Sequence, residues 1–254
     1  MHTAVITQPD DFSAFRSHAK RLLAANAAPA TVIWTDDCHD TLFQDAASDA
    51  ECVAYVPRAF VALAEAVACH RSRERWSLLY QTLWRLAHGE RSLLKNEADP
   101  LVHKINRMAT AVRHDQHRMT AFVRFNAVAE GEDTHYIAWY EPQHYVLRRT
   151  ADFFIDRFAA MRFSILTPDL SFHWDGRNSQ FGPGMRRDSA APADAMEEGW
   201  KRYYAAIFNP ARSNPDLMAR HMPRRFWRNL PEAASIHSLV ADAGSRTAKM
   251  VERD

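Results

Sequence analysis

The sequence is short of cysteine, of glycine and of any excess of charge. Its 254 residues include three cysteines, seven glycines, and 32 basic against 31 acidic side chains. The cysteines (Cys38, Cys52 and Cys69) are few and odd in number, which argues against a disulfide scaffold and fits a reducing compartment. The balanced charge neither favours nor excludes a nucleic-acid partner, because only the distribution of charge along the fold can decide that.

The chain also lacks the segments that direct proteins into or across membranes. No basic-then-apolar leader opens the sequence, and no uninterrupted apolar run reaches about 18 residues. We therefore expect a soluble cytoplasmic protein with no membrane partner. With 47% hydrophobic residues, the chain can bury a sizeable core as one large domain or two small ones.

Signature motifs of common enzyme classes are missing as well. The sequence contains no GxGxxG, Walker-type loop, GxSxG, HExxH or CxxxCxxC. An acidic run at 36–51 holds no Lys or Arg, and it is either a solvated loop or a carboxylate cluster for a divalent metal. Because no companion histidine or carboxylate motif supports the metal, we expect no metal and no cofactor.

Hydrophobic periodicity predicts helices and strands in both halves of the chain. Apolar strands at 4–6 and 31–34 flank an amphipathic helix at 11–25, which suggests a small βαβ element. Apolar stripes at 57–67 and 72–87 indicate a helical hairpin. Further along, strands are predicted at 122–125 and 136–140, with 143–147 as a candidate continuation, and a helix capped by Thr150 follows.

The helix that begins at Asp99 and Pro100 is the most informative one for function. Its apolar stripe consists of Leu101, Ile105, Met108, Val112 and Met119. A second stripe, about 100° around the helix, consists of Lys104, Arg107, Ala111, His114 and Arg118. A basic stripe beside a buried one suits a phosphate backbone, and an ordinary solvated face would look the same.

The stretch 163–188 reads as a glycine-rich meander. Strands at 163–166 and 171–174 are separated by a Pro-Asp turn, and Asp175-Gly176 is a hairpin signal. The basic residues at its end, Arg186 and Arg187, suit a phosphate-bearing ligand. A structural hairpin with a charged end is the alternative interpretation. In the first interpretation, His173, Asp175, Arg186 and Asp188 form a catalytic pocket, with His173 as general acid or base.

A second basic block lies at 201–228 and is interleaved with aromatic residues. Seven Lys and Arg side chains stand there against one acidic residue, Asp216. Cations that hold phosphates and rings that stack bases are typical of proteins that bind single-stranded or base-flipped DNA. Including Arg124, which follows the helix begun at Asp99, the DNA-binding candidates are Lys104, Arg107, His114, Arg118, Arg124, Tyr204, Arg212, Arg224, Arg225, Trp227 and Arg228.

Several of these stretches resemble one bacterial family of unknown function. The similar motifs are VIWTDD, AVRHDQHRMTAFVRF, YIAWYEPQHYVL, ILTPD, HWDG, FGPG, FNPARSNP and MPRRFWRNLPEA, and together they cover nearly the whole chain. Members of that family are described as DNA metabolism or DNA repair proteins. They occur beside a radical S-adenosylmethionine (radical SAM) protein, and some are fused to a domain of the uracil-DNA glycosylase superfamily. The resemblance therefore implies a process, DNA repair, and no particular chemistry.

These observations lead to one architecture and three functional hypotheses. We predict an α+β fold, with a predominantly helical layer on a small mixed or antiparallel sheet, divided into 1–95, a family core at 96–244 and a flexible tail at 245–254. The first hypothesis is a DNA-binding accessory protein that works with a radical SAM or uracil-DNA glycosylase-like partner. The second is an enzyme acting on damaged DNA or nucleotides, and the third is a protein scaffold that binds no DNA. We expect no glycosylase activity from this chain itself, since neither a water-activating acid nor a histidine loop is identifiable.

Overall fold

The computed structural model describes residues 1–36, 56–130, 133–187 and 222–230, together with Ala233, Ile236, Leu239, Ala241 and Asp242. The chain divides into two compact units. The first comprises residues 1–116 and 143–146, and the second comprises 117–142 and 147–254. The domain boundaries expected from the sequence stay a prediction, and the proposed tail at 245–254 lies outside the described residues.

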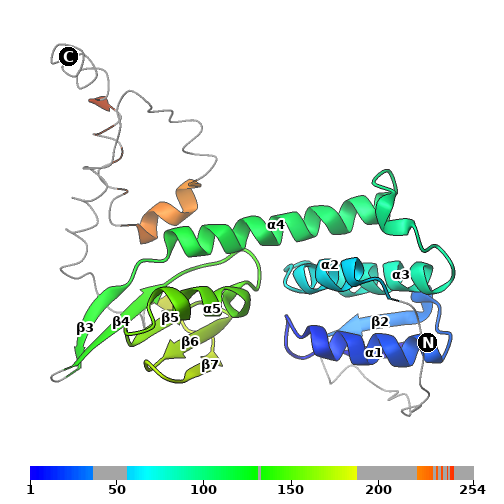
Figure 1. Ribbon diagram of the computed structural model, residues 1–254, viewed down its shortest axis with the longest axis horizontal. Helices are drawn as coiled ribbons and strands as arrows, with labels where there is room; N and C mark the ends of the chain where they lie inside the picture. The colour runs from blue at the N-terminus through cyan, green and yellow to red at the C-terminus, as the bar shows by residue number, and fades with distance from the viewer. Residues whose placement is uncertain are drawn as a thin grey trace. The chain divides into compact units, whose positions relative to one another are not determined.

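The first unit begins with the βαβ element. Strand β1 (His2–Val5) pairs in parallel with β2 (Val32–Thr35), and α1 (Phe12–Ala24) connects them. Helix α1 starts where the Asp11 carboxylate accepts a hydrogen bond from the Ala14 amide at 2.8 Å, an ordinary N-cap. The element, expected from the sequence, is confirmed (Figure 1).

A helical hairpin packs against this element. Helices α2 (Arg58–Ala68) and α3 (Arg75–Ala87) bury their apolar stripes in one core with α1 and the first half of α4 (Pro100–Phe122). Phe15 lies at the centre of that core, with its ring stacked on Trp76 at a centroid distance of 5.3 Å. Short 3-10 helices at Pro29–Thr31 (η1) and Leu93–Lys95 (η2) complete the unit.

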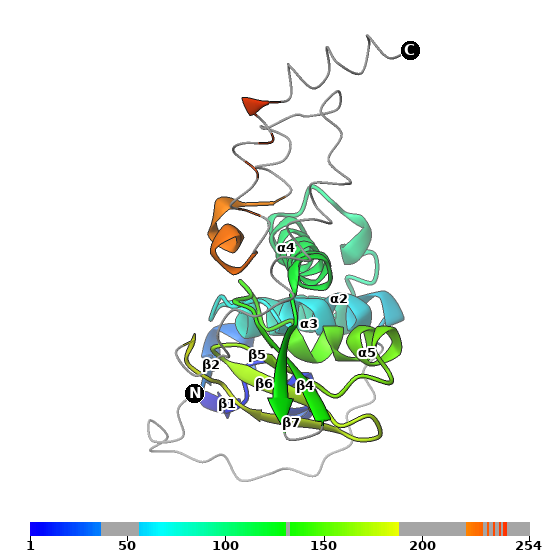
Figure 2. The ribbon, with the colours of Figure 1, turned by 90° about the vertical axis from the view of Figure 1, so that its left-hand side faces the viewer.

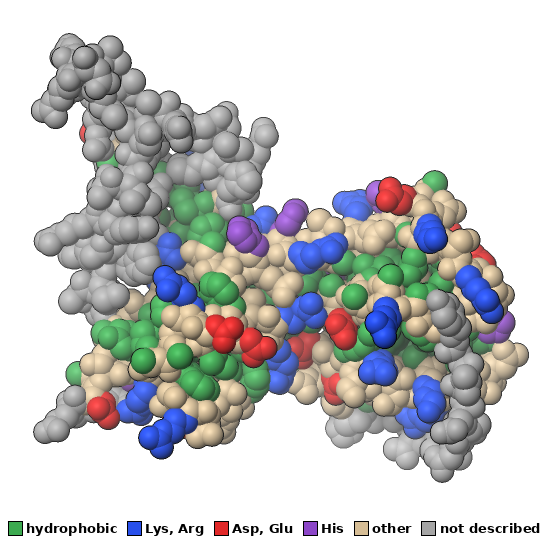
Figure 3. Space-filling model, in the orientation of Figure 1, with side chains coloured by type: hydrophobic (Ala, Val, Ile, Leu, Met, Phe, Trp, Pro, Cys, Tyr) green, Lys and Arg blue, Asp and Glu red, His purple; other side chains and the backbone are tan. Residues whose placement is uncertain are grey.

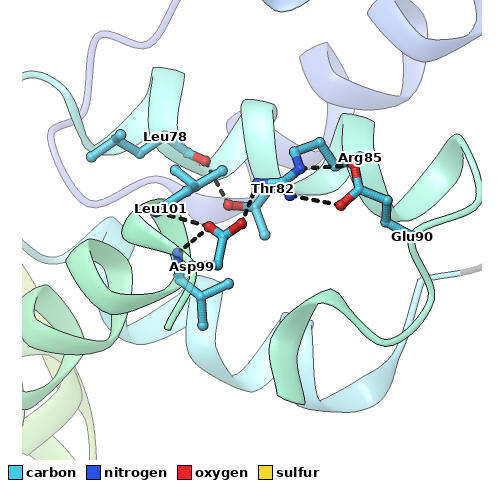
Figure 4. A network of polar contacts seen from close by, with 7 residues as sticks. Leu78, Thr82, Arg85, Glu90, Asp99 and Leu101 are labelled. Carbon is cyan, nitrogen blue, oxygen red and sulfur yellow. Dashed lines mark hydrogen bonds and ion pairs between the residues drawn. The ribbon is translucent and has the colours of Figure 1, made fainter. Parts of the chain in front are cut away.

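The start of α4 is fixed to the end of α3 by one carboxylate, shown in Figure 4. Oδ1 of Asp99 accepts hydrogen bonds from the amides of Leu101 at 2.9 Å and Val102 at 3.2 Å. Its other oxygen lies 2.9 Å from Nη1 of Arg85, and Arg85 also forms a two-bond fork with Glu90. The hydrogen bond from Arg85 and those from the two amides lower the pKa of Asp99.

The second unit is built on a five-stranded mixed sheet in the order β3-β4-β5-β6-β7. The strands are β3 (Asn126–Glu130), β4 (Asp133–Trp139), β5 (Phe163–Leu166), β6 (Leu170–Trp174) and β7 (Ser179–Pro183). Only β4 and β5 pair in parallel; the other neighbours are antiparallel (Figure 2). The α+β class and the mixed sheet are as predicted, and the meander has its hairpin at Asp175-Gly176.

One face of this sheet is apolar and carries the second core. Phe163, Ile165 and Phe172 are fully buried there, with Phe154 of α5 (Leu147–Arg157) and Phe125 packed around them. A 3-10 helix, η5 (Arg224–Asn229), is anchored by Phe226, whose ring stacks on Tyr140 at 5.6 Å. No described helix is both long and apolar enough to cross a bilayer.

Three local predictions are wrong. The proposed strand at 122–125 is absent: Phe122 is the last residue of α4, the Val123 amide still bonds to the Met119 carbonyl at 3.1 Å, and residues 123–125 connect the helix to β3. Residues 143–146 do not extend the sheet: they belong to the first unit, and α5 begins at Leu147. Thr150 therefore sits inside α5, with its hydroxyl donating to the Leu147 carbonyl rather than capping the helix.

The strand at 163–166 differs from expectation in burial. The alternation of apolar and polar residues predicted a half-buried strand, whereas all four residues are buried. The cause is its central place in the sheet, with β4 on one side and β6 on the other. A polar side chain there, Ser164, must find partners among its neighbours in the sheet.

The Asp99 cap gives a test of stability. Asp99→Ala should lower the free energy of unfolding by about 1 kcal/mol or more, since it removes the N-cap acceptor. Asp99→Asn keeps a good cap and loses only the ion pair, so it should cost less. Urea unfolding at neutral pH measures both.

Acid should reduce the difference in stability between the wild type and each of these variants. Because the pKa of Asp99 is lowered in the folded state, its charge stabilises the protein above the unfolded pKa, and that stabilisation is lost as pH falls through the folded value. Equal unfolding free energies for the wild type and Asp99→Ala at neutral pH would contradict the role of this carboxylate.

Candidate nucleic-acid interface and a serine–histidine network

The outward face of α4 carries cations and histidines and no acid. Asp115 is the only acidic residue of the helix, and it is fully buried, where its Oδ2 accepts a hydrogen bond from the His144 amide at 2.9 Å. The basic and histidine residues of the helix are His103, Lys104, Arg107, Arg113, His114, His117 and Arg118. Figure 3 shows Lys, Arg and His side chains gathered along α4.

Within the first unit, Arg107, Arg113 and His114 are all exposed. Lys104 is exposed too, and its ammonium lies 2.6 Å from the Glu74 carboxylate. An ion pair this exposed contributes little and is screened by salt, so a phosphate can compete for Lys104. We call Lys104, Arg107, Arg113 and His114 the α4 cationic face.

Sequence reasoning missed Arg113. Arg113 lies outside the stripe that starts at Lys104 and proceeds in steps of three and four, because it is about 120° around the helix from Arg107. The signal that could have found it is the absence of any exposed carboxylate on the whole outer arc of the helix. Among the described residues its guanidinium donates one hydrogen bond, to the Thr110 hydroxyl at 3.4 Å, and the side chain is exposed.

The other predicted DNA contacts have mixed surroundings. Arg118 is half-buried and belongs to the second unit. Arg124 Nη1 donates to the Ala121 carbonyl at 2.8 Å and to the Val123 carbonyl at 3.2 Å, so it helps to terminate α4.

In η5, Arg224 and Arg225 are exposed, and Arg225 covers the ring of Phe226 at 4.6 Å. The indole of Trp227 is half-buried and donates to the Met222 carbonyl at 3.0 Å. The side chain of Arg228, and the residues Tyr204 and Arg212, lie outside the described part of the chain. Because the first basic residues of α4 and those of η5 belong to different units, the convergence of the two basic blocks stays a prediction.

Among the predicted catalytic residues that the structure describes, Asp175 closes a turn. Its Oδ1 accepts hydrogen bonds from the amides of Arg177 at 2.7 Å and Asn178 at 2.6 Å, which closes the β6–β7 hairpin and lowers the pKa of the carboxyl. Arg186 is exposed beyond the end of β7, and Asp188 lies outside the described residues. In the described part of the chain, His173 has other partners.

A chain of four hydrogen-bonding side chains runs across β4, β5 and β6. Ser164 Oγ lies 2.7 Å from Nδ1 of His173 and 2.9 Å from Nε2 of His135. On the other side of its ring, Nε2 of His173 lies 3.0 Å from Oγ of Ser171. The two serines are almost fully buried, at 2% and 1% exposure, while both histidines are half-buried.

The bonding capacity of this network allows two arrangements of its protons. A serine hydroxyl has one proton, so Ser164 donates to one imidazole and accepts from the other. Moving that proton reverses the donors and acceptors along the row, which is how a proton relay works. Burial, and secondarily the nearby His135, lower the pKa of His173, which keeps its ring neutral and able to accept a proton near neutral pH.

Gly182 leaves the space that the network needs. A Cβ at this position on β7 would lie 2.6 Å from Ser171 Oγ, much closer than van der Waals contact. The cross-strand partner of Gly182 is Ser171 itself. Glycine is therefore required here by close approach to a hydroxyl rather than by its backbone angles.

Gly182→Ala should destabilise the protein by about 1–3 kcal/mol through this clash. In the double variant Gly182→Ala/Ser171→Ala the colliding oxygen is gone, so the cost of the alanine should fall to well under half. Urea unfolding of the wild type, both single variants and the double variant forms a complete cycle. An equal cost of Gly182→Ala in both backgrounds would contradict the clash.

His173 should titrate below the usual histidine pKa of about 6.5. Replacing His135 by Gln removes one cause of the shift, so the pKa of His173 should rise while remaining below 6.5, since burial is the larger cause. Stability should decline as pH falls below about 6.5, because the unfolded state then takes up a proton that the folded ring resists. NMR titration of the imidazole signals measures this, and a His173 pKa above 6.5 would disprove the assignment.

Two comparisons with known proteins gave no match: no curated protein and no solved structure corresponds to this chain. Among the described residues, no group of three or more His, Cys, Asp or Glu side chains could hold a metal ion. One family model matches residues 73–232, which include α3, α4, α5, the five-stranded sheet and η5. The match covers more than half of the chain and contains both the α4 cationic face and the serine–histidine network. The chain belongs to the family described as Domain of unknown function (DUF4130).

Proposed function

We propose that this protein is a DNA-binding accessory factor of a bacterial DNA repair system and that the α4 cationic face holds the phosphate backbone. The observation that carries the proposal is the removal of the only carboxylate of α4 into the interior while every cation of the face stays exposed. An exposed arc of Arg, Lys and His on a helix, with no acid among them, is the usual electrostatic footprint of a nucleic-acid surface.

The geometry of α4 also suits a backbone contact better than base recognition. From Lys104 to His114 the helix rises by about 15 Å at 1.5 Å per residue, and Lys104, Arg107 and His114 lie within about 80° of one another around its axis, so they can meet successive phosphates. Arg113 lies about 120° from Arg107, at the other edge of the exposed arc, where it can meet a phosphate of the opposite strand. Arginine forks bind phosphate oxygens with two bonds, whereas the neighbouring histidine adds one. Contacts of this kind position a protein on DNA without reading sequence, which is the role of an accessory factor.

The process and the partners rest on the resemblance stated from the sequence motifs. Family members of that description are found with a radical SAM protein or a uracil-DNA glycosylase-like domain, and we propose a partner of either kind for this chain. Such a partner would catalyse the reaction, and this protein would bind the DNA. In this proposal Arg224, Arg225 and Trp227 offer a second contact to DNA, on the second unit.

The test is a binding series with charge-matched variants. Arg107→Gln/Arg113→Gln should weaken duplex binding on the order of tenfold at about 50 mM salt and make the log–log salt dependence shallower by about 1.8, since two phosphate contacts are lost. The control Arg58→Gln/Arg177→Gln removes two exposed arginines from elsewhere and should leave both quantities nearly unchanged. Fluorescence anisotropy on plain, uracil-containing, ultraviolet-damaged and single-stranded oligonucleotides measures the series.

The same series can reject the proposal. If the wild-type chain binds none of these oligonucleotides at about 50 mM salt, DNA binding is wrong. If both double variants weaken binding equally, the protein binds DNA through its general charge and the α4 cationic face has no special part.

The serine–histidine network favours one second candidate, an enzyme acting on damaged DNA or nucleotides. Its support is the neutral, half-buried His173 bonded to two serine hydroxyls, an arrangement suited to general base catalysis. A scaffold without DNA binding, the third hypothesis, would be favoured by failure of the binding series together with partner capture that persists at high salt.

A further inference from the structure

A cavity of about 360 Å³ opens between α1 and α2 in the first unit, with Leu83 of α3 at its base. Figure 1 shows the two helices side by side. The volume falls within the range of small-ligand sites. Neither the α4 cationic face nor the serine–histidine network takes part in its lining.

The floor of the cavity is aromatic and rigid. Phe15 and Phe60 are almost completely buried, at 1% and 3% exposure, and Phe12 joins them as a half-buried wall. The Phe15 ring is held on both sides: it stacks on Phe12 at 6.0 Å and 22° and on Trp76 at 5.3 Å and 18°. A floor fixed in this way is formed before any ligand arrives, and it offers an apolar aromatic surface to a ligand.

The mouth of the cavity is cationic. Arg16 and Lys20 lie one turn apart on α1, both are exposed, and neither makes an ion pair or hydrogen bond among the described residues. Ser13 and Ser17 lie on the same side and add hydroxyl groups. No acidic residue lines the described cavity, and α1 contains none at all. In Figure 3, Lys and Arg side chains lie over α1 beside hydrophobic surface.

We propose that this cavity binds a nucleoside monophosphate, with the base against the phenylalanine floor and the phosphate between Arg16 and Lys20. Two cations a helical turn apart suit a dianion with several acceptor oxygens better than a single carboxylate. Three phenyl rings favour an aromatic base over an aliphatic chain, because aromatic rings gain edge-to-face contacts in addition to burial. The site is separate from the proposed DNA surface and does not depend on it.

The experiment is calorimetric titration of the full chain with four probes: thymidine 5′-monophosphate, adenosine 5′-monophosphate, thymidine and inorganic phosphate. Either monophosphate should bind at least tenfold more tightly than thymidine or phosphate alone. Arg16→Gln/Lys20→Gln should weaken monophosphate binding at least tenfold. The charge-matched control Arg58→Gln/Lys95→Gln, outside the cavity, should bind as the wild type does.

Other results would overturn the site. Phosphate that binds as tightly as the monophosphates would mean a bare anion patch, and no heat from either monophosphate would mean no site. Val61→Trp tests the location, because Val61 lines the cavity and a large ring there should block the monophosphates. Unchanged binding by a folded Val61→Trp protein would place the ligand elsewhere.

The outcome is distinguishable from the test of DNA binding. Arg16→Gln/Lys20→Gln should keep its affinity for duplex DNA, and Arg107→Gln/Arg113→Gln should keep its affinity for the monophosphates. Loss of both activities in both variants would contradict two separate sites.

Discussion

The hydrogen bond between the buried Asp115 carboxylate and the His144 amide is the interaction on which the segment 143–146 and the charge of the outer face of α4 depend. It faces inward from α4 and accepts the amide hydrogen of His144, which ties the segment 143–146 to the helix. The same segment is held by the α2–α3 turn, since Tyr145 donates its amide hydrogen to the Cys69 carbonyl and Arg71 bonds the Gln143 carbonyl. A buried acid without a hydrogen-bond partner would be costly, and the His144 amide supplies one such bond to Oδ2. Its burial also leaves the outer face of α4 with one sign of charge.

Buried polar side chains in the second unit also have hydrogen-bond partners. Ser164 stands at the middle of a fully buried strand, where an unbonded hydroxyl would destabilise the fold. Two histidines from the neighbouring strands supply its bonds, and Ser171 completes the row where Gly182 makes room. Such a network can stabilise the fold alone, or it can stabilise the fold and also transfer protons. Proton transfer is possible because the lowered pKa keeps His173 neutral while its side chain remains half exposed.

Much of the fold could be predicted because its signals are local. Helical stripes gave α1, α3 and α4, and the Asp-Gly turn gave the β6–β7 hairpin. The failures at 122–125 and 143–147 have a common cause. Short apolar stretches such as these fit a strand, a helix end or a loop equally well, and contacts distant in the sequence decide among them. For the candidate site, the basic residues of α4 were visible in the sequence, whereas the pairing of His173 with Ser164 rather than Asp175 was not.

The sequence by itself determined which helices form and which side of each is buried, because a period of 3.6 residues is written into the order of the side chains. It also determined that α4 would carry many cations and one acid. Only the tertiary structure decided the remaining questions: that this acid points inward, that Asp175 closes a turn, and that Arg16 and Lys20 stand beside an aromatic cavity. Each of these depends on the surroundings that the folded chain provides, and a local sequence pattern does not predict which elements come into contact.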